Sequence, residues 1–292
     1  MAIPAGFEHI TRENERLGPY TWFRLGGAAQ FFAEPTSVEE LAALVLHCHE
    51  ADLPLRVLGG GSNVLVRDQG VPGFVVSLAA AAFARIEVEG RTLTAGCGAK
   101  LGHVISTAVR EGLAGLEMLV GIPGTLGGAL HTNAGTPGGD IGQHTASATV
   151  MNAKGELVAR SKSELRFGYR DSSLDDVVIL DARLELEPGD PKHLTKQMQQ
   201  AWIIKRAQQP WTEQNSGQIF KNPSGTSAAS LIKDAGLSST RVGDVELCDR
   251  NANFLISGPK ASSREVLELI EQVRQEVAQR TGVELELALE VW

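Results

Sequence analysis

The sequence predicts an α+β fold, in which helices and short strands follow one another without internal repeats. Residues 37–51 have the pattern of an amphipathic helix, with Ser37 as the N-cap and acidic residues in the first turn. A second helix is indicated near the C-terminus, where Ser262 opens a capping box. Short apolar runs at residues 55–58 and 74–78 are typical of strands. Since 42% of the 292 residues are hydrophobic and 21% are charged, the chain has enough apolar residues for a globular core.

A second group of elements follows in residues 91–186. Residues 91–98 are interpreted as a strand and residues 99–113 as a helix with apolar residues at helical spacing. Two further strands are expected near residues 148–151 and 177–186, where apolar and β-branched residues gather.

The last third of the chain begins with a long polar helix. Asp190 is its expected cap, Pro191 its first residue and Gln209 its approximate end, which fits a connector between domains. Beyond it we expect a helix at residues 227–235, a strand at residues 253–256 and the final helix. The apolar residues expected to form the buried stripe of that final helix are Val266, Leu269, Ile270, Val273 and Val277.

Charge and composition exclude several classes of partner. The formal net charge is −8, and Lys and Arg form no cluster, which disfavours nucleic acid and anionic membranes. The N-terminal residues MAIPAGFEHI lack the basic start and apolar core of a leader, and no run approaches the length of a membrane span. We therefore expect a cytoplasmic protein, acting as a monomer.

The cysteines do not indicate a metal or redox centre. Cys48, Cys97 and Cys248 lack the spacing of either kind of site, so buried free thiols are expected. His47 and His49 flank Cys48, but neighbours one and two residues apart on a helix point in different directions. No metal is predicted.

Two glycine-rich strings carry most of the functional information. They are LGGGSNVLVRDQG from Leu58 and VGIPGTLGGALHTNAG from Val120. Successive backbone amides in such turns form concave nests for an anion such as a diphosphate. A Walker loop would need Lys and then Ser or Thr after its last glycine, whereas Ser62 and Asn63 follow Gly61, and the Rossmann fingerprint is also missing. Glycines that only serve tight turns are the alternative, but two such strings, each behind an apolar run, favour a dinucleotide site.

The motifs resemble a known family. LGGGSNVLV, GIPGTLGGALHTNAG, FGYR from Phe167, QQP from Gln208 and IFKNP from Ile219 are similar in order and spacing to the UDP-N-acetylenolpyruvoylglucosamine reductases (MurB) of the shorter subtype. The resemblance extends from about Thr21 to the C-terminus.

The resemblance implies a domain organisation and a cofactor. It implies a two-part FAD-binding region of the PCMH/MurB type, residues 1–77 and 78–189, followed by an α+β substrate-binding domain, residues 190–292, whose C-terminal strand returns towards the flavin. FAD is expected without a covalent link, because no His or Cys stands in residues 59–63 or 121–128, the turns that would supply the amides. The expected cofactor contacts are Thr21, Gly26, Gly27, Leu58, Gly59, Gly60, Gly61, Ser62, Asn63, Gly121, Ile122, Pro123, Gly124, Thr125, Gly127, Gly128, Asn133 and Gly135.

The resemblance also implies the reaction. The family uses NADPH and FAD to reduce UDP-N-acetylglucosamine enolpyruvate, a nucleotide sugar, to UDP-N-acetylmuramate in peptidoglycan precursor synthesis. Arg170 in FGYR matches the family arginine that polarises the substrate carboxylate, a role that suits a planar bidentate donor. Four further residues match positions that face the substrate, although each alone would more often be a solvated polar residue: Tyr169, Arg206, Lys221 and Asn222.

Two catalytic positions depart from the family pattern. The family proton donor, a Ser or Cys before x-F-K-N-P, falls on Gln218, whose amide has no proton to give near neutral pH. The family ends near L-E-x-E-V, and alignment without a gap places Ala288 at its second acid, whereas a two-residue slip uses Glu290 instead. Strand alternation puts Glu286 on the same face as Ala288 and Glu290. Asn251, where relatives commonly carry His, is a softer change that also fits a polar residue capping a strand.

Three hypotheses from different classes follow from these residues. The first is an active reductase that protonates its product through water or a displaced acid. The second is a FAD-binding homologue with weak, altered or no reductase activity, because Gln218 and Ala288 replace the expected acids. The third is a different flavin oxidoreductase on the same fold.

Overall fold

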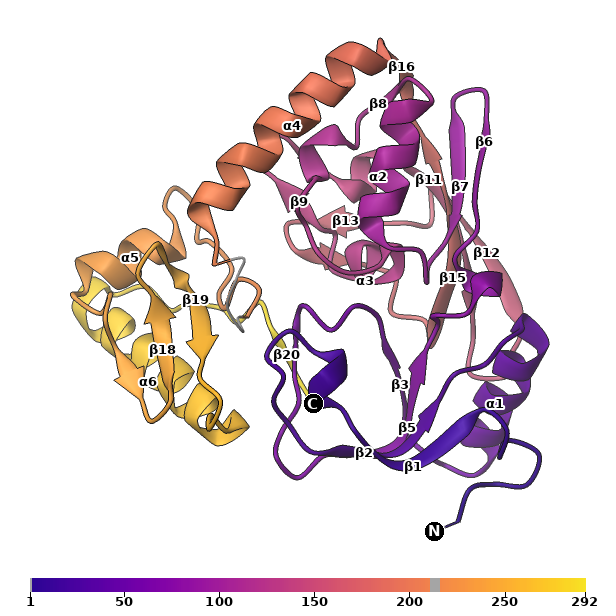
Figure 1. Ribbon diagram of the computed structural model, residues 1–292, viewed down its shortest axis with the longest axis horizontal. Helices are drawn as coiled ribbons and strands as arrows, with labels where there is room; N and C mark the ends of the chain where they lie inside the picture. Colours follow the sequence, from indigo (N-terminus) through magenta and orange to yellow (C-terminus); the bar gives the residue numbers. More distant parts are fainter. Residues whose placement is uncertain (1, 211–215) are drawn as a thin grey trace. The chain divides into compact units, whose positions relative to one another are not determined.

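The computed structural model describes residues 2–210 and 216–292, which form two compact units (Figure 1). The first unit contains residues up to 15, 30–60 and 72–204, and the second contains residues 16–29, 61–71 and those from 205 on. The mixture of sheets and helices in each unit confirms the α+β class. The predicted division at residues 77 and 189 stays a prediction.

A five-stranded antiparallel sheet is the larger sheet of the first unit. Helices α2 (Leu101–Arg110) and α3 (Leu126–His131) share a buried cluster with its strands, in which Val104 and Leu126 meet Val150 and Leu184. Figure 1 shows α2 alongside β7. The strand order is β12 (Leu157–Ser161), β11 (Thr145–Met151), β15 (Val178–Glu185), β7 (Thr92–Gly96) and β6 (Ile86–Glu89).

A four-stranded sheet accompanies helix α1 (Val38–Glu50) in the same unit. Leu41 and Leu44 of the helix are fully buried in a cluster with Phe31 and Phe74 of the sheet. The Oγ of Ser37 accepts the Glu40 amide at 3.2 Å, which confirms the predicted N-cap. The strand order is β1 (Thr11–Arg16), β2 (Ala28–Ala33), β5 (Val71–Ser77) and β3 (Leu55–Leu58), of which the sequence indicated only the last two.

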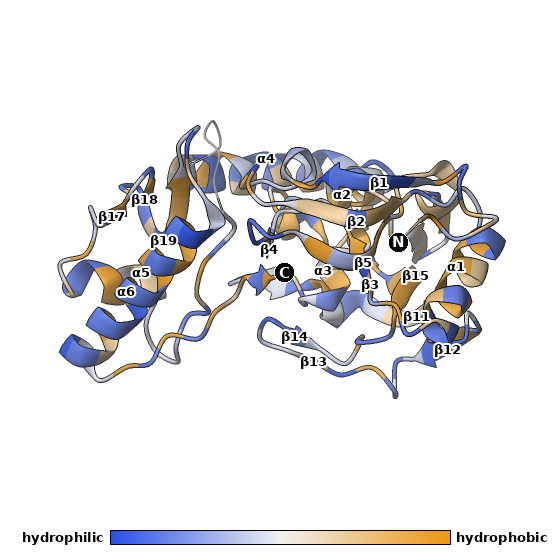
Figure 2. Ribbon diagram, turned by 90° about the horizontal axis from the view of Figure 1, so that it is seen from below, coloured by the Kyte–Doolittle hydropathy of each residue, from blue (hydrophilic) through white to orange (hydrophobic). Residues whose placement is uncertain are grey.

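One long helix and several short strands and 3-10 helices lie outside these two sheets. Helix α4 (Pro191–Gln208) begins where predicted, because the Asp190 carboxylate accepts the His193 amide at 3.1 Å. Figure 2 shows mostly hydrophilic residues along α4 and hydrophobic residues along β15. The two-residue strands of the first unit are β8 (Leu113–Ala114), β9 (Gly135–Thr136), β10 (Gly139–Asp140), β13 (Phe167–Gly168), β14 (Asp171–Ser172) and β16 (Glu187–Pro188), and the 3-10 helices are η2 (Ala81–Phe83), η3 (Glu117–Leu119) and η4 (Ile141–His144).

The second unit packs two helices on a three-stranded antiparallel sheet. The capping box at Ser262 and the predicted buried stripe of the final helix are both confirmed. Two short parallel strands pair residues 64–65 with residues 290–291. The elements are η1 (Gly18–Tyr20), β4 (Val64–Leu65), α5 (Ala228–Asp234), β17 (Arg241–Val242), β18 (Val245–Cys248), β19 (Asn251–Ser257), α6 (Ser263–Thr281) and β20 (Glu290–Val291).

The predicted state of the cysteines is confirmed, since Cys48, Cys97 and Cys248 are buried and free. Within the described ranges, no helix combines the length and apolar character that crossing a bilayer requires.

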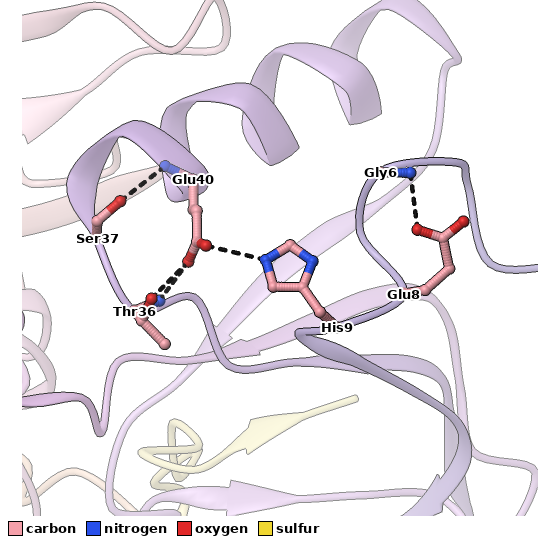
Figure 3. A network of polar contacts seen from close by, with 6 residues as sticks. All are labelled: Gly6, Glu8, His9, Thr36, Ser37 and Glu40. Atoms are coloured by element: carbon pink, nitrogen blue, oxygen red, sulfur yellow. Dashed lines mark hydrogen bonds and ion pairs between the residues drawn. The ribbon is translucent and has the colours of Figure 1, made fainter.

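A polar network fixes the N-terminal end of α1 (Figure 3). The Glu40 carboxylate accepts hydrogen bonds from the amide and the hydroxyl of Thr36, both at 2.8 Å, and lies 2.9 Å from Nε2 of His9. Hydrogen bonding to His9 and then to Thr36 lowers the pKa of Glu40 from its usual 4.5 to about 2. The carboxylate form therefore stabilises the folded protein.

We predict that Glu40→Gln lowers the melting temperature at neutral pH and that this difference disappears in acid. Because the folded pKa lies below the unfolded one, the stabilisation is complete above about pH 4.5 and is lost as the pH falls towards 2. Thermal melts of both proteins from neutral pH to about pH 3 measure the difference. Glu50→Gln at the far end of α1 is the matched control. A difference for Glu40→Gln that stays constant over this range would contradict the prediction.

Candidate functional site

The two glycine-rich strings meet backbone to backbone in the first unit. A Cβ placed on Gly60 would lie 2.5 Å from Cα of Gly124, and one placed on Gly59 would lie 2.7 Å from Oγ1 of Thr125. Strand β3 ends at Leu58 and leads directly into this turn. Glycine is required here because the approach leaves no room for a side chain.

The amides of this turn are available to a ligand. Gly59 and Gly60 are exposed, and within the described residues their backbone N–H groups have no acceptor. Gly121 and Gly124 of the second string adopt left-handed backbone with φ of +79° and +111°. Adjacent unpaired amides in a tight glycine turn form an anion-binding nest, so these residues fit the diphosphate of FAD.

The end of the second string has a structural task instead. The amide of Gly127 donates to the Cys97 carbonyl at 2.9 Å, and that of Gly128 points to Oγ1 of Thr125 at 3.4 Å. A Cβ on Gly127 would also lie 3.0 Å from Cβ of Cys97. The Gly127 amide is thus used at the strand end near Cys97 and the Gly128 amide in the cap of α3, while the cofactor contacts expected at these two residues stay predictions. Burial raises the pKa of the Cys97 thiol, which keeps it neutral.

Asn133 holds the hairpin that carries Arg170. Its buried side-chain amide donates to the Gly168 carbonyl at 2.6 Å and accepts the Gly142 amide at 3.0 Å. The hydroxyl of Ser172 adds a bond to the His131 carbonyl at 3.0 Å. Asn133 thus clamps the β13–β14 turn, and the cofactor contact expected for it stays a prediction.

Arg170 occupies the two-residue turn of this hairpin. Its φ is +55°, a left-handed conformation that few residues other than Gly, Asn and Asp adopt. Its guanidinium carbon lies 6.0 Å from the centroid of the Tyr169 ring, and Tyr169 is 57% exposed. The hairpin therefore presents both predicted residues at the surface of the first unit.

In the second unit, the TWFRLGG segment packs against residues 61–68. The Trp22 amide donates to the Gly61 carbonyl at 3.0 Å, and the Gly27 amide donates to the Arg67 carbonyl at 2.9 Å. A Cβ on Gly26 would lie 2.5 Å from that of Val66. Thr21 is buried and its hydroxyl donates to the Gly18 carbonyl at 3.2 Å. These contacts explain the glycines of the segment by close packing.

Asn253 positions the FKNP segment, a role that the sequence analysis missed. It is buried, its Oδ1 accepts the Phe220 amide at 2.9 Å and its Nδ2 donates to the Phe220 carbonyl at 2.8 Å. The amide of Ile219 donates to the Asn253 carbonyl at 3.0 Å. A polar residue within the apolar strand pattern was the available signal. Asn251 begins β19, and its Oδ1 accepts the Asn253 amide at 3.0 Å.

The predicted substrate residues of the second unit already have protein partners. Lys221 donates from Nζ to the Glu286 carboxylate at 2.6 Å. The Oδ1 of Asn222 accepts the Ala228 amide at 3.0 Å, at the start of α5. Arg206 is exposed in the last turn of α4.

The two positions that depart from the family pattern, Gln218 and Ala288, lie close together in the second unit. The Ala288 amide donates to the carbonyl of Ile219, the residue after Gln218, at 2.8 Å. The side chain of Asn63 donates to the Ala288 carbonyl at 2.9 Å, and the Glu290 amide donates to the Asn63 carbonyl at 2.9 Å. The C-terminal strand β20 thus runs parallel to β4, which lies within the first glycine string.

Comparisons with known proteins point to one family. Residues 209–292 match the model described as UDP-N-acetylenolpyruvoylglucosamine reductase, C-terminal domain, and residues 29–161 match the model of a FAD binding domain. The chain is 39% identical over 290 residues to the UDP-N-acetylenolpyruvoylglucosamine reductase of Rhodopirellula baltica, covering 99% of this chain and 95% of that one. It is 40% identical over 274 residues to the Bradyrhizobium protein of the same name, covering 94% of this chain and 89% of that one. The crystal structure of the Thermus caldophilus reductase (MurB) matches with a TM-score of 0.84 at 34% identity, over 97% of this chain and 99% of that one.

We predict that Gly60→Ala abolishes retention of FAD. The added Cβ meets the Gly124 backbone, so the turn must open and its amides must move. Flavin absorbance per protein after gel filtration measures retention. Gly102→Ala on the exposed side of α2, where a Cβ meets nothing within 4 Å, is the control and should retain flavin fully. Full occupancy in Gly60→Ala would remove the nest assignment.

Proposed function

Because the chain belongs to the UDP-N-acetylenolpyruvoylglucosamine reductase family, we propose that it reduces UDP-N-acetylglucosamine enolpyruvate to UDP-N-acetylmuramate with FAD and NADPH, in peptidoglycan precursor synthesis. The observation that carries this proposal is the exposed, unpaired amide pair of Gly59 and Gly60, packed on Gly124 within the residues matched by the FAD model. Cytoplasmic location and a monomeric state stay predictions.

Bound FAD supplies the hydride chemistry, and the protein supplies binding and charge stabilisation. We assign the amides of Gly59 and Gly60 to the diphosphate of FAD. The left-handed turns at Gly121 and Gly124 keep side chains away from this place. The nest is uncharged, so it holds an anion without requiring a cation in this acidic protein.

Arg170 is the proposed ligand of the substrate carboxylate. As the vinyl group is reduced, negative charge moves onto this carboxylate, and a fixed guanidinium stabilises that charge more than it stabilises the ground state. The Asn133 clamp on Gly168 supports the role, because it fixes the turn from which the arginine projects. The ring of Tyr169 lies beside this guanidinium, with its centroid 6.0 Å from the guanidinium carbon.

The proton that completes the reduction needs a donor other than Gln218, because a neutral amide is no acid near pH 7. We assign this task to Glu290, acting directly or through water. The indole Nε1 of Trp292 donates to Oε2 of Glu290 at 3.2 Å, which orients the carboxyl group. Asn63 holds the same strand through the Glu290 amide.

Anaerobic half-reactions test the proposed function. We expect NADPH to bleach the flavin and UDP-N-acetylglucosamine enolpyruvate to restore its absorbance. Arg170→Ala should slow the second step by about 10²-fold or more and leave the first unchanged, because its partner is the substrate carboxylate. Arg166→Ala, an exposed arginine before the same hairpin, is the matched control. No reoxidation by the substrate in the wild type would favour the FAD-binding homologue without reductase activity, and equal slowing of both steps would give Arg170 a structural role.

We predict that Glu290→Gln slows reoxidation by substrate by about 10²- to 10⁴-fold, the usual size of a general-acid effect, without changing reduction by NADPH. Glu284→Gln, an exposed residue before the strand, should leave both steps unchanged.

The reciprocal pair Gln218→Ser with Ala288→Glu separates the two alignments. If position 288 is the acid position, the pair should raise the reoxidation rate by about 10²-fold, and Glu290→Gln should have no effect. That outcome would contradict the assignment of Glu290.

A further inference from the structure

Two arginines adopt a backbone conformation that favours glycine. Five non-glycine residues within the described ranges have positive φ, and three of them are Asn or Asp, which tolerate it. The other two are Arg170, at +55°, and Arg24, at +52°. A strained residue that persists in a fold points to a task for its side chain. Arg170 has a proposed task, whereas Arg24 has none.

The backbone of Arg24 is held from several sides. Its amide donates to the Thr21 carbonyl at 3.2 Å. The preceding Phe23 is 1% exposed in the core of the second unit, and its carbonyl accepts the Ser257 hydroxyl at 3.2 Å. A Cβ on Gly18 would lie 3.0 Å from the Arg24 carbonyl oxygen. These contacts impose the left-handed conformation through the main chain, so the local fold does not depend on an arginine side chain.

The guanidinium of Arg24 is open to a ligand. The residue is exposed, and within the described residues no hydrogen bond or ion pair involves its side chain. By contrast, Arg12, Arg91 and Arg160 each pair with a carboxylate. Five N–H donors in a planar fork suit a phosphate or a carboxylate.

The neighbours of Arg24 pack against the first glycine string, which has the composition of a phosphate-binding turn. Two residues earlier, the Trp22 amide donates to the carbonyl of Gly61, the third glycine of the first string. Two residues later, Gly26 closes on Val66 in a turn with φ of +104°. The chain carries a net charge of −8, so a local cation strengthens the binding of a nucleotide with several phosphates beyond what uncharged amides provide.

We propose that Arg24 binds a phosphate group of a nucleotide ligand, and that its strained backbone is retained to aim the guanidinium. The ligands of the proposed function offer three such groups: the diphosphate of FAD, the diphosphate of the UDP sugar and the 2′-phosphate of NADPH. The proposal rests on the proposed function only for this choice of nucleotides.

Equilibrium titrations that require no turnover test the proposal. Purified Arg24→Asn and Arg24→Ala are titrated with UDP, NADP⁺ and NAD⁺, and their apoproteins with FAD. We expect both variants to bind one of these ligands about tenfold more weakly, the size of one charge-assisted hydrogen bond. Loss for NADP⁺ but not NAD⁺ identifies the 2′-phosphate, loss for UDP the sugar nucleotide, and loss for FAD the cofactor.

Thermal melting separates ligand binding from packing. Asn tolerates the left-handed conformation and Ala does not, so Arg24→Asn should melt at or above the wild-type temperature, and Arg24→Ala should melt below Arg24→Asn. Arg16→Asn, another exposed arginine of the second unit, controls for the loss of one positive charge. The proposal is overturned if affinities change no more than in Arg16→Asn, or if only Arg24→Ala loses affinity. If Arg24→Asn loses affinity while the wild type fails to reduce the enolpyruvyl substrate, the proposed function falls and the phosphate site stands.

Discussion

The contact between Gly60 and Gly124 is the constraint on which the ligand site of the first unit depends. Two chain segments approach so closely that position 60 has no room for a side chain, and the exposed amides of Gly59 and Gly60 are left without acceptors within the described residues. Side-chain donors would require space that this approach removes. The site is therefore made from main chain, and its chemistry depends on glycine positions more than on polar residue types.

The sequence correctly predicted the helices and strands whose signals are local. The final helix combined a capping box with a stripe of apolar residues at helical spacing, and both were found as predicted. Strands β1, β2 and β4 were missed, because a few residues with mixed polarity become strands only when a distant partner supplies the hydrogen bonds.

The site residues also divide into those with a local sequence signal and those whose role depends on distant partners. The glycines of the first string were indicated by their own spacing, and Arg170 was indicated by the resemblance of FGYR to the family motif. Asn133 and Asn253 act by bonding main-chain groups that are distant in sequence, so a single sequence shows only two polar residues in unremarkable places. In the same way, the sequence did not show that the Gly127 amide donates to the Cys97 carbonyl. Local patterns reveal donors, but only the fold reveals which donors are already in use.

The short parallel ladder of β4 with β20 also has a consequence for the order of folding. Asn63 and Ala288 are 225 residues apart in the sequence, yet a hydrogen bond joins them. Next to it, Glu290 pairs with Val64 in the ladder. During synthesis the glycine string leaves the ribosome long before its partner strand exists, so the β4 edge must wait in an unpaired state. Contacts of such long sequence separation form late and slowly. The part of the site that contains Glu290 therefore forms last during synthesis. A ribosome-bound nascent chain should acquire it only after residue 290 has emerged.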